Sequence, residues 1–440
     1  MTETLNIFKD WVQDQSRKGS DFVLSKDFRQ RSLSEVRTEN FPTRKNEEWR
    51  YTPLSSVFDR QPSFAAEAEV NPADVEQLTA AFADAHHLVF IDGHFNRTLS
   101  DEISVLARDG IAINLLEDLE PGSQDEVERV IKNAKLTDDN IFRHITQGLA
   151  RTGLFIELQK NIEITKPLHL LFLGTQSGKT TLSNPINVVH LNPNSRLKII
   201  QQFASVTATK ALTIPADYFQ IDEGAALEIY KLGLESDETD HLSNTYAQLA
   251  DAGSLNHHQY LFGSRFTRTN TEINFAGSGS EVVLRGIYLG DKSQHLDIRT
   301  YVDHAQPNCM SDQHFRGIMN DHSRGVFNGL VLVREHAQKT NAQQSNKNLL
   351  LSRDARVDTK PQLEIHADDV KCAHGATIGE LDENALFYLQ SRGISKQDAA
   401  LMLTRAFATE ITQEVKLDSL REYIQAEIEA RLMEAQNFHV

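Results

Sequence analysis

The sequence predicts a mainly β protein in which strands stack into a solenoid between two helical ends. From about His87 to about Gly379, short segments rich in Val, Ile, Leu and Phe alternate with turn residues, and almost no helix-length apolar stripe interrupts them. Within this region apolar strand starts recur at steps of 30, 28 and 27 residues, at Leu197, Leu227, Leu255 and Val282. Before and after it the apolar spacing is helical.

The N-terminal end, residues 1–86, is predicted to be helical. Ile7, Trp11 and Val12 have helical spacing, and Ala73 to His86 is an alanine-rich acidic stretch. Between them, Trp49 to Leu54 is interpreted as an anchor that packs onto the main body. A ligand platform built from the Trp and the Tyr two residues later is the alternative.

The central region, residues 87–380, is predicted to hold the stacked strands. Turn residues precede each strand start in register, at Pro193-Asn194-Ser195, Asp222-Glu223-Gly224, Asp251-Ala252-Gly253 and Gly277-Ser278-Gly279. A near-constant step with turns in register is typical of a solenoid, whose rungs share one continuous core. From the pattern alone, a β-sandwich is the alternative, because it also has many short strands.

The C-terminal end, residues 381–440, is predicted to be helical again. Ser395 is a candidate N-cap, with Asp398 near the first-turn amides. Further on, an i, i+4 apolar stripe predicts a helix that buries one face: Leu420, Ile424, Ile428 and Leu432. Glu427 and Arg431 form a favourable pair on its outer side.

Charge and composition exclude several classes of function. The chain of 440 residues has 45 Lys and Arg against 62 Asp and Glu, a net charge of −17, which opposes binding to nucleic acid or to an anionic membrane surface. No apolar run approaches the roughly 20 residues that span a bilayer. The N-terminus lacks the features of a signal peptide, and the two cysteines, Cys309 and Cys372, cannot form a disulfide framework. A cytoplasmic location is therefore expected.

One glycine-rich segment imitates a nucleotide-binding loop. Gly174 is followed by Gly178-Lys179-Thr180, but only three residues separate the two glycines, whereas the phosphate-binding loop needs four. Pro185 follows closely, so the loop does not open a helix. A turn between two strands is expected here.

The candidate site residues are Cys372 and His374. If Val370 to His374 is extended, the period of two places these two side chains on one face of a strand. A thiolate and an imidazole are suitable ligands for iron, zinc or a forming cluster. Two ligands do not complete a metal site, however, and a buried cysteine beside a hydrogen-bonded core histidine is the structural alternative. A catalytic Cys–His pair lacks an evident orienting partner and oxyanion donors.

Several ordered motifs identify a family. The chain resembles the SufB/SufD family of iron–sulfur cluster assembly scaffolds from about Phe41 to its C-terminal helices. The segments that carry the resemblance are 46–54, Gly317, 325–329, 343–352, 354–361, Cys372-Ala373-His374-Gly375 and 386–394. Within the family, the two cysteines favour the SufD type over the SufB type, whose members tend to be longer and richer in cysteine.

The resemblance implies a right-handed parallel β-helix and a non-catalytic scaffold of the SUF system. It implies pairing with SufB through rungs at roughly residues 310 to 380, and docking of the SufC ATPase on the C-terminal helices. A transient iron–sulfur cluster, or iron, is then expected at the SufB interface, with none held stably by this chain alone. His374 is the expected iron ligand or the residue through which iron enters, and Cys372 an auxiliary thiol.

Three alternatives stay open at this point. The chain could form a homodimer in the absence of its partners. It could be a β-helical hydrolase or lyase that uses Cys372 and His374. It could also be a pure assembly protein in which both residues belong to the core.

Overall fold

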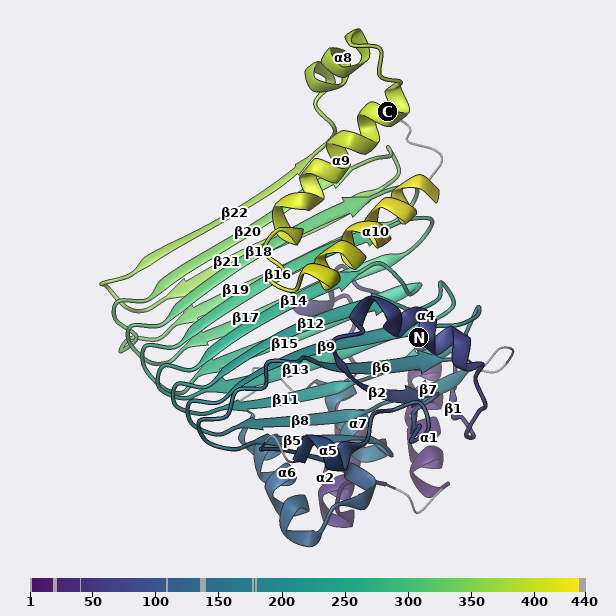
Figure 1. Cartoon of the computed structure of the whole chain (residues 1–440), viewed down its shortest axis with the longest axis vertical. Coiled ribbons are helices and arrows are strands. Elements are labelled where there is room, and N and C mark those ends of the chain that lie inside the picture. Colours follow the sequence, from purple (N-terminus) through teal and green to yellow (C-terminus); the bar gives the residue numbers. More distant parts are fainter. Residues whose placement is uncertain are drawn as a thin grey trace.

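The chain folds into a parallel β-solenoid with helices at both ends (Figure 1). The computed structural model describes residues 2–18, 22–39, 41–107, 110–134, 140–175, 178 and 180–434. The fold class predicted from the strand repeat is confirmed.

Two sheets form the walls of the solenoid, and after β8 successive long strands alternate between them. The ten-stranded sheet contains β3 (His94–Phe95), β2 (His86–Ile91), β6 (Leu168–Gly174), β9 (Arg196–Ser205), β12 (Ala226–Leu234), β14 (Ser254–Leu261), β16 (Glu281–Gly290), β18 (Met310–Met319), β20 (Asn341–Leu350) and β22 (Lys371–Gly379). The central path of the other sheet contains β4 (Ile111–Leu115), β5 (Gly153–Leu158), β8 (Ile186–Leu191), β11 (Ala216–Ile221), β13 (Asp240–Leu249), β15 (Phe266–Phe275), β17 (His295–His304), β19 (Arg324–Val333) and β21 (Arg356–Ile365). Three short strands join it at one side: β1 (Ser63–Phe64), β7 (Thr181–Ser183) and β10 (Ala211–Thr213).

The strand register reproduces the sequence repeat. Leu197, Leu227, Leu255 and Val282 are direct partners in neighbouring parallel strands. Each is at most 2% exposed, so this column faces the core. Stacked parallel rungs exclude the β-sandwich, in which antiparallel strands pair.

The turns that end these rungs also stack. Asn194, Gly224, Gly279 and Asn308 have φ angles between +60° and +67°. At Gly224 a Cβ atom would lie 2.5 Å from Asn194 Oδ1, so a side chain there would collide with the turn beside it. The turn residues seen in the sequence are therefore one corner of the solenoid.

The N-terminal part of the chain is mainly helical. They are α1 (Thr2–Arg17), α2 (Lys26–Thr38), the 3₁₀ turn η1 (Glu47–Trp49), α3 (Ser55–Phe58), α4 (Pro72–Thr79) and the 3₁₀ turn η2 (Ala80–Phe82). Trp11 and Val12 are buried as predicted, whereas Ile7 is 44% exposed. Trp49 is 8% exposed, and the Arg268 guanidinium carbon lies 3.7 Å from its ring centroid. The segment from Trp49 is thus an anchor on the twelve-stranded sheet, and the ligand-platform alternative has no support.

The expectation of almost uninterrupted strands after His87 was wrong over residues 103–149. Helices α5 (Ile103–Leu106), α6 (Pro121–Asn133) and α7 (Ile141–Leu149) lie there, together with the 3₁₀ turn η4 (Leu116–Asp118). In α6, Val127, Val130 and Ile131 pack against side chains of β8 and β11. Their i, i+3, i+4 spacing is helical, but the stripe is short and was hidden among apolar segments.

The C-terminal helices are α8 (Glu383–Ser391), α9 (Lys396–Thr412) and α10 (Asp418–Glu434). The predicted cap is confirmed, because Ser395 Oγ accepts a hydrogen bond from Asp398 N at 3.1 Å. The predicted stripe from Leu420 to Leu432 is at most 2% exposed and packs against Tyr230 and Tyr260 of the ten-stranded sheet. Figure 1 shows α8 standing beyond the last strands.

The glycine-rich segment after β6 connects two strands, as expected. β6 ends at Gly174 and β7 begins at Thr181. Gln176, Ser177 and Lys179 lie outside the described residues.

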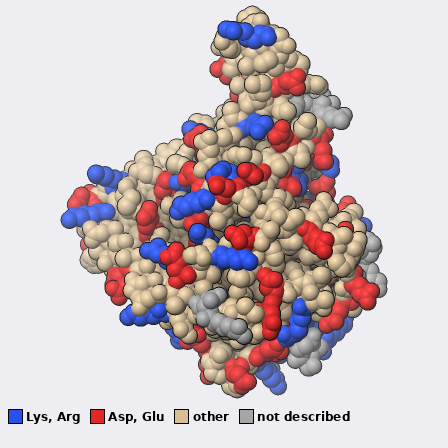
Figure 2. All heavy atoms as spheres, in the orientation of Figure 1, with Lys and Arg blue, Asp and Glu red and all other residues tan. Residues whose placement is uncertain are grey.

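The surface carries charged side chains of both signs. On the face shown in Figure 2, acidic and basic side chains are interspersed. None of the described helices is both long and apolar enough to cross a membrane.

Candidate functional site at the open end of the solenoid

The solenoid ends in two strands that each have one free edge. β21 and β22 are the last strands of their sheets, and among the described residues each has a ladder partner on one side only, β19 and β20 respectively. Ile365 and Ile378 continue inward-facing columns on these strands, yet they are 40% and 47% exposed. The core therefore reaches the surface at this end, which we call the open end.

Cys372 and His374 both lie on β22, the terminal strand. Cys372 pairs with Ala342 and His374 pairs with Gln344, and both of these partners are buried inside the solenoid. The predicted shared face is thus confirmed, and it is the inward face of the last rung. Cys372 is half-buried against the core, whereas His374 is exposed.

Cys372 also has the position of a core residue. It continues the column that begins at Leu197 and passes through Val282 and Ala342. Burial raises the pKa of its thiol, and a backbone hydrogen bond at Ala342 acts in the opposite direction. A raised pKa keeps the thiol protonated at neutral pH, which makes Cys372 a poor nucleophile until a cation displaces its proton.

The two side chains do not form a catalytic pair in this structure. Two positions along a strand separate their Cα atoms by roughly 6.6 Å. Among the described residues, no hydrogen bond joins Cys372 to His374. The arrangement supplies two separate donors at the open end.

The described residues do not complete a metal site at that position. In the described part of the chain, no group of three or more His, Cys, Asp or Glu side chains is placed to hold a metal ion. A structural site generally needs four ligands. Within the described residues, His374 and Cys372 are therefore an incomplete set of metal ligands.

The other cysteine lies elsewhere and is structural. Cys309 is fully buried at a turn, and its Sγ atom donates to Gly277 O at 3.4 Å. Burial raises the pKa of its thiol. His304, five residues earlier in the chain, forms a hydrogen bond with Ser311 inside the core.

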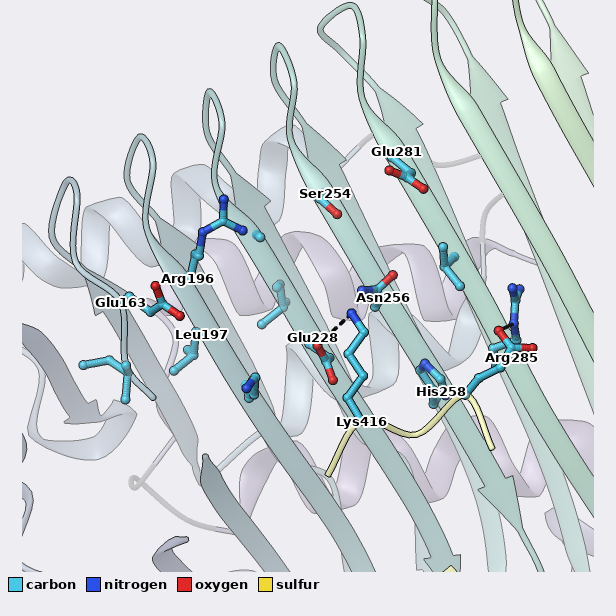
Figure 3. Close-up of a pocket in the computed structure, with 16 residues that line it drawn as sticks. Glu163, Arg196, Leu197, Glu228, Ser254, Asn256, His258, Glu281, Arg285 and Lys416 are labelled. Carbon is cyan, nitrogen blue, oxygen red and sulfur yellow. Dashed lines mark hydrogen bonds and ion pairs between the residues drawn. The ribbon is translucent and has the colours of Figure 1, made fainter. Parts of the chain in front are cut away.

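A groove of about 580 Å³ lies on the outer face of the ten-stranded sheet beside the α9–α10 connection (Figure 3). Its charged side chains largely neutralise one another: Lys416 Nζ lies 3.6 Å from Glu228 Oε2, and Arg285 Nε lies 2.5 Å from Glu414 Oε2. None of its lining residues belongs to the last rungs. The groove is therefore distinct from the open end.

The sequence analysis did not predict the buried polar side chains on β20, the strand that pairs with the strand of His374. Gln344, Asn346 and Asn348 alternate along β20 and are at most 3% exposed. Alternating amides on a strand usually indicate its solvent face. The signal that could have revealed them is the strand repeat, which places Gln344 two residues after Ala342 in the inward column.

Two family models match the chain. Residues 172–407 match the model described as "SUF system FeS cluster assembly, SufBD core domain", and residues 5–170 match the SufBD protein N-terminal region. The chain is 33% identical to the iron-sulfur cluster assembly protein SufD of Escherichia coli, over 92% of both chains. It is 27% identical to an iron-sulfur cluster assembly SufBD family protein of Synechocystis, over 86% of this chain and 85% of the relative. With SufD of Bacillus subtilis it shares 23% identity over 69% of each chain.

Proposed function

We propose a non-catalytic scaffold role for this chain, which belongs to the SufBD family of SUF-system iron–sulfur cluster assembly proteins. It would work in the cytoplasm as the SufD-like subunit of a complex, help to acquire iron, and share a nascent cluster with a sibling scaffold of the SufB type. The observation that carries this proposal is the open end, where a thiol and an imidazole lie on a rung that the described residues leave uncovered.

The free edges of β21 and β22 support pairing with a sibling solenoid. An exposed strand edge is a template for pairing with another chain, and soluble proteins usually protect it. Here the edges lie beside exposed apolar side chains, Ile365 and Ile378. A second solenoid placed end to end would pair both edges and bury both side chains. A second copy of this chain could occupy the same edges when the sibling is absent.

The imidazole and the thiol at the open end suit an iron–sulfur cluster as cargo. His374 would bind iron through an imidazole nitrogen, and Cys372 would contribute its thiolate once iron displaces the proton. Because these two donors do not complete a ligand set, the sibling would supply the remaining ligands. The cluster would then form between the chains and would leave without remaining as a cofactor of either.

The C-terminal helices support docking of the SufC ATPase. On α8, Phe387 is 73% exposed and Tyr388 is 57% exposed. Adjacent exposed aromatic side chains are typical of a protein interface. Helix α9 contacts α8 and also β16 and β18 of the ten-stranded sheet. Movement of docked ATPase subunits would therefore act on rungs near the open end.

Copurification from cells that coexpress this chain with SufB and SufC tests the pairing. Ile378→Asp places a charge at the open end and should reduce recovery of SufB at least tenfold, while the folded chain tolerates it because the side chain is already exposed. Met433→Asp, at a 62% exposed position on α10, is the matched control and should retain SufB. Equal recovery of SufB with both variants would contradict pairing through the open end.

Phe387→Ala combined with Tyr388→Ala tests the ATPase docking in the same cells. The double variant should lose SufC and keep SufB, because the main partner of α8 among the described elements is α9. Retention of SufC at the wild-type ratio would place its docking surface elsewhere.

A further inference from the structure

The interior of the last rungs contains a short ladder of hydrogen-bonded polar side chains. Thr300 Oγ1 donates to Gln313 Oε1 at 2.7 Å, and Gln344 Nε2 donates to the same oxygen at 3.4 Å. All three residues are at most 3% exposed. The ladder runs toward the open end, because Gln313 pairs with Gln344, and Gln344 pairs with His374.

In the ladder, the last amide lies with its nitrogen toward Gln313. Since Gln344 uses its nitrogen to reach Gln313, its oxygen is left for another partner. Gln344 Oε1 is buried and has no hydrogen-bond partner among the described residues. A buried carbonyl oxygen without a donor is destabilising, so it is a strong acceptor for any N–H that approaches.

Gly329 makes the space in which this amide lies. It belongs to β19, in the opposite sheet, where it pairs with Thr300. A Cβ atom at Gly329 would collide with Gln344 Nε2 and lie 2.9 Å from its Cδ. The absence of a side chain at this glycine, the last residue of the segment 325–329, therefore allows the Gln344 amide to cross the interior.

We infer that Gln344, held in place by Gly329 and Gln313, is a positioning residue that accepts a hydrogen bond from the His374 imidazole. Register neighbours in parallel strands lie about 4.8 Å apart, so the two side chains are within reach of one another. A metal-binding histidine usually donates its second ring N–H to an oxygen, which fixes the tautomer and the direction of the other nitrogen. Gln344 supplies that oxygen from inside the solenoid.

This inference rests on the proposed role of His374, and the test separates the two. The probe is ferrous iron alone, titrated anaerobically into the cluster-free complex with SufB and SufC, and its Kd is measured by competition with a chromophoric chelator. Gln344→Met keeps the volume and removes the acceptor, and it should weaken iron binding about 10- to 100-fold. Gly329→Ala should do the same by displacing the Gln344 amide.

Matched variants distinguish positioning from general structure. Gln343→Met makes the same chemical change one residue earlier, at an exposed position, and should leave the Kd unchanged. In a His374→Ala background, Gln344→Met should cause no further loss, because it acts through His374. Thermal midpoints of all variants show whether the fold is intact.

Each contrary outcome has one meaning. If wild type does not bind iron, or His374→Ala binds it as wild type does, the proposed site itself is wrong. If His374→Ala weakens binding but Gln344→Met and Gly329→Ala do not, only the positioning role of Gln344 is overturned. The same conclusion follows if Gln344→Met weakens binding equally with and without His374. Should Gln344→Met fail to fold, Gly329→Ala carries the test.

Discussion

Mild acid should destabilise this protein strongly, because its core holds histidines as neutral imidazoles. Four of them are at most 4% exposed, and burial lowers the pKa of each to about 3: His169, His257, His258 and His304. In the unfolded chain the same side chains have a pKa of about 6.5. Between these values the unfolded state binds protons that the folded state does not, so stability falls as the pH falls.

The size of the effect follows from this difference. Between pH 7.5 and pH 5.5, each buried histidine costs about 1.4 kcal/mol of unfolding free energy, or about 5 kcal/mol for the four. His190 acts in the opposite direction, because its hydrogen bond to Asp222 raises its pKa. Burial also lowers the pKa of His144 and His295 to about 4, so these two histidines add to the loss. A loss of about 5 kcal/mol is a large share of the roughly 5–15 kcal/mol that stabilises a typical protein.

Urea unfolding at the two pH values measures the loss, and His257→Leu tests its cause. His257 lies between Ile229 and Leu284 in its inward column, so leucine fits the chemistry of the site. The variant should reduce the pH-dependent loss by about 1.4 kcal/mol. His322→Leu, at a side chain 70% exposed, should not change it. An unchanged pH dependence in His257→Leu, or an equal change in both variants, would refute the reasoning.

Two further substitutions test the packing of the solenoid. Lys231→Met should lower the free energy of unfolding in urea by about 3–5 kcal/mol, because it leaves Asp217 as an unpaired buried charge. Combining Lys231→Met with Asp217→Asn should recover most of the lost stability. A double variant as unstable as the single one would contradict this account. Trp49→Ala should cost about 3–5 kcal/mol and make the segment before α3 sensitive to trypsin, because the indole packs in the core and against Arg268. Wild-type resistance to trypsin would show that Trp49 is not the anchor.

The repeat and the helical stripes could be predicted from the sequence because they depend on local periodicity. Leu197, Leu227 and Leu255 are equivalent positions of successive rungs, and such equivalence is visible as a constant step. Helices α6 and α7 could not be predicted in the same way. Their apolar residues pack on the outer face of a sheet. In the sequence these short helical stripes stand next to strand segments of similar composition, so the two are hard to distinguish.

The candidate site was only partly predictable. The shared face of Cys372 and His374 follows from the period of two along a strand. That β22 is the last rung, which leaves His374 exposed, depends on where the stacking stops. The relation between Gly329 and Gln344 joins opposite sheets, so no local pattern contains it.

The content of iron and acid-labile sulfide in the anaerobically purified complex with SufB and SufC tests the central claim most directly. Wild type is compared with His374→Ala and with His322→Ala, which removes an exposed histidine from the turn between β18 and β19. We predict that all three complexes assemble and that only His374→Ala loses its iron and sulfide. A fully loaded His374→Ala complex would contradict the assignment of the open end as the cluster site.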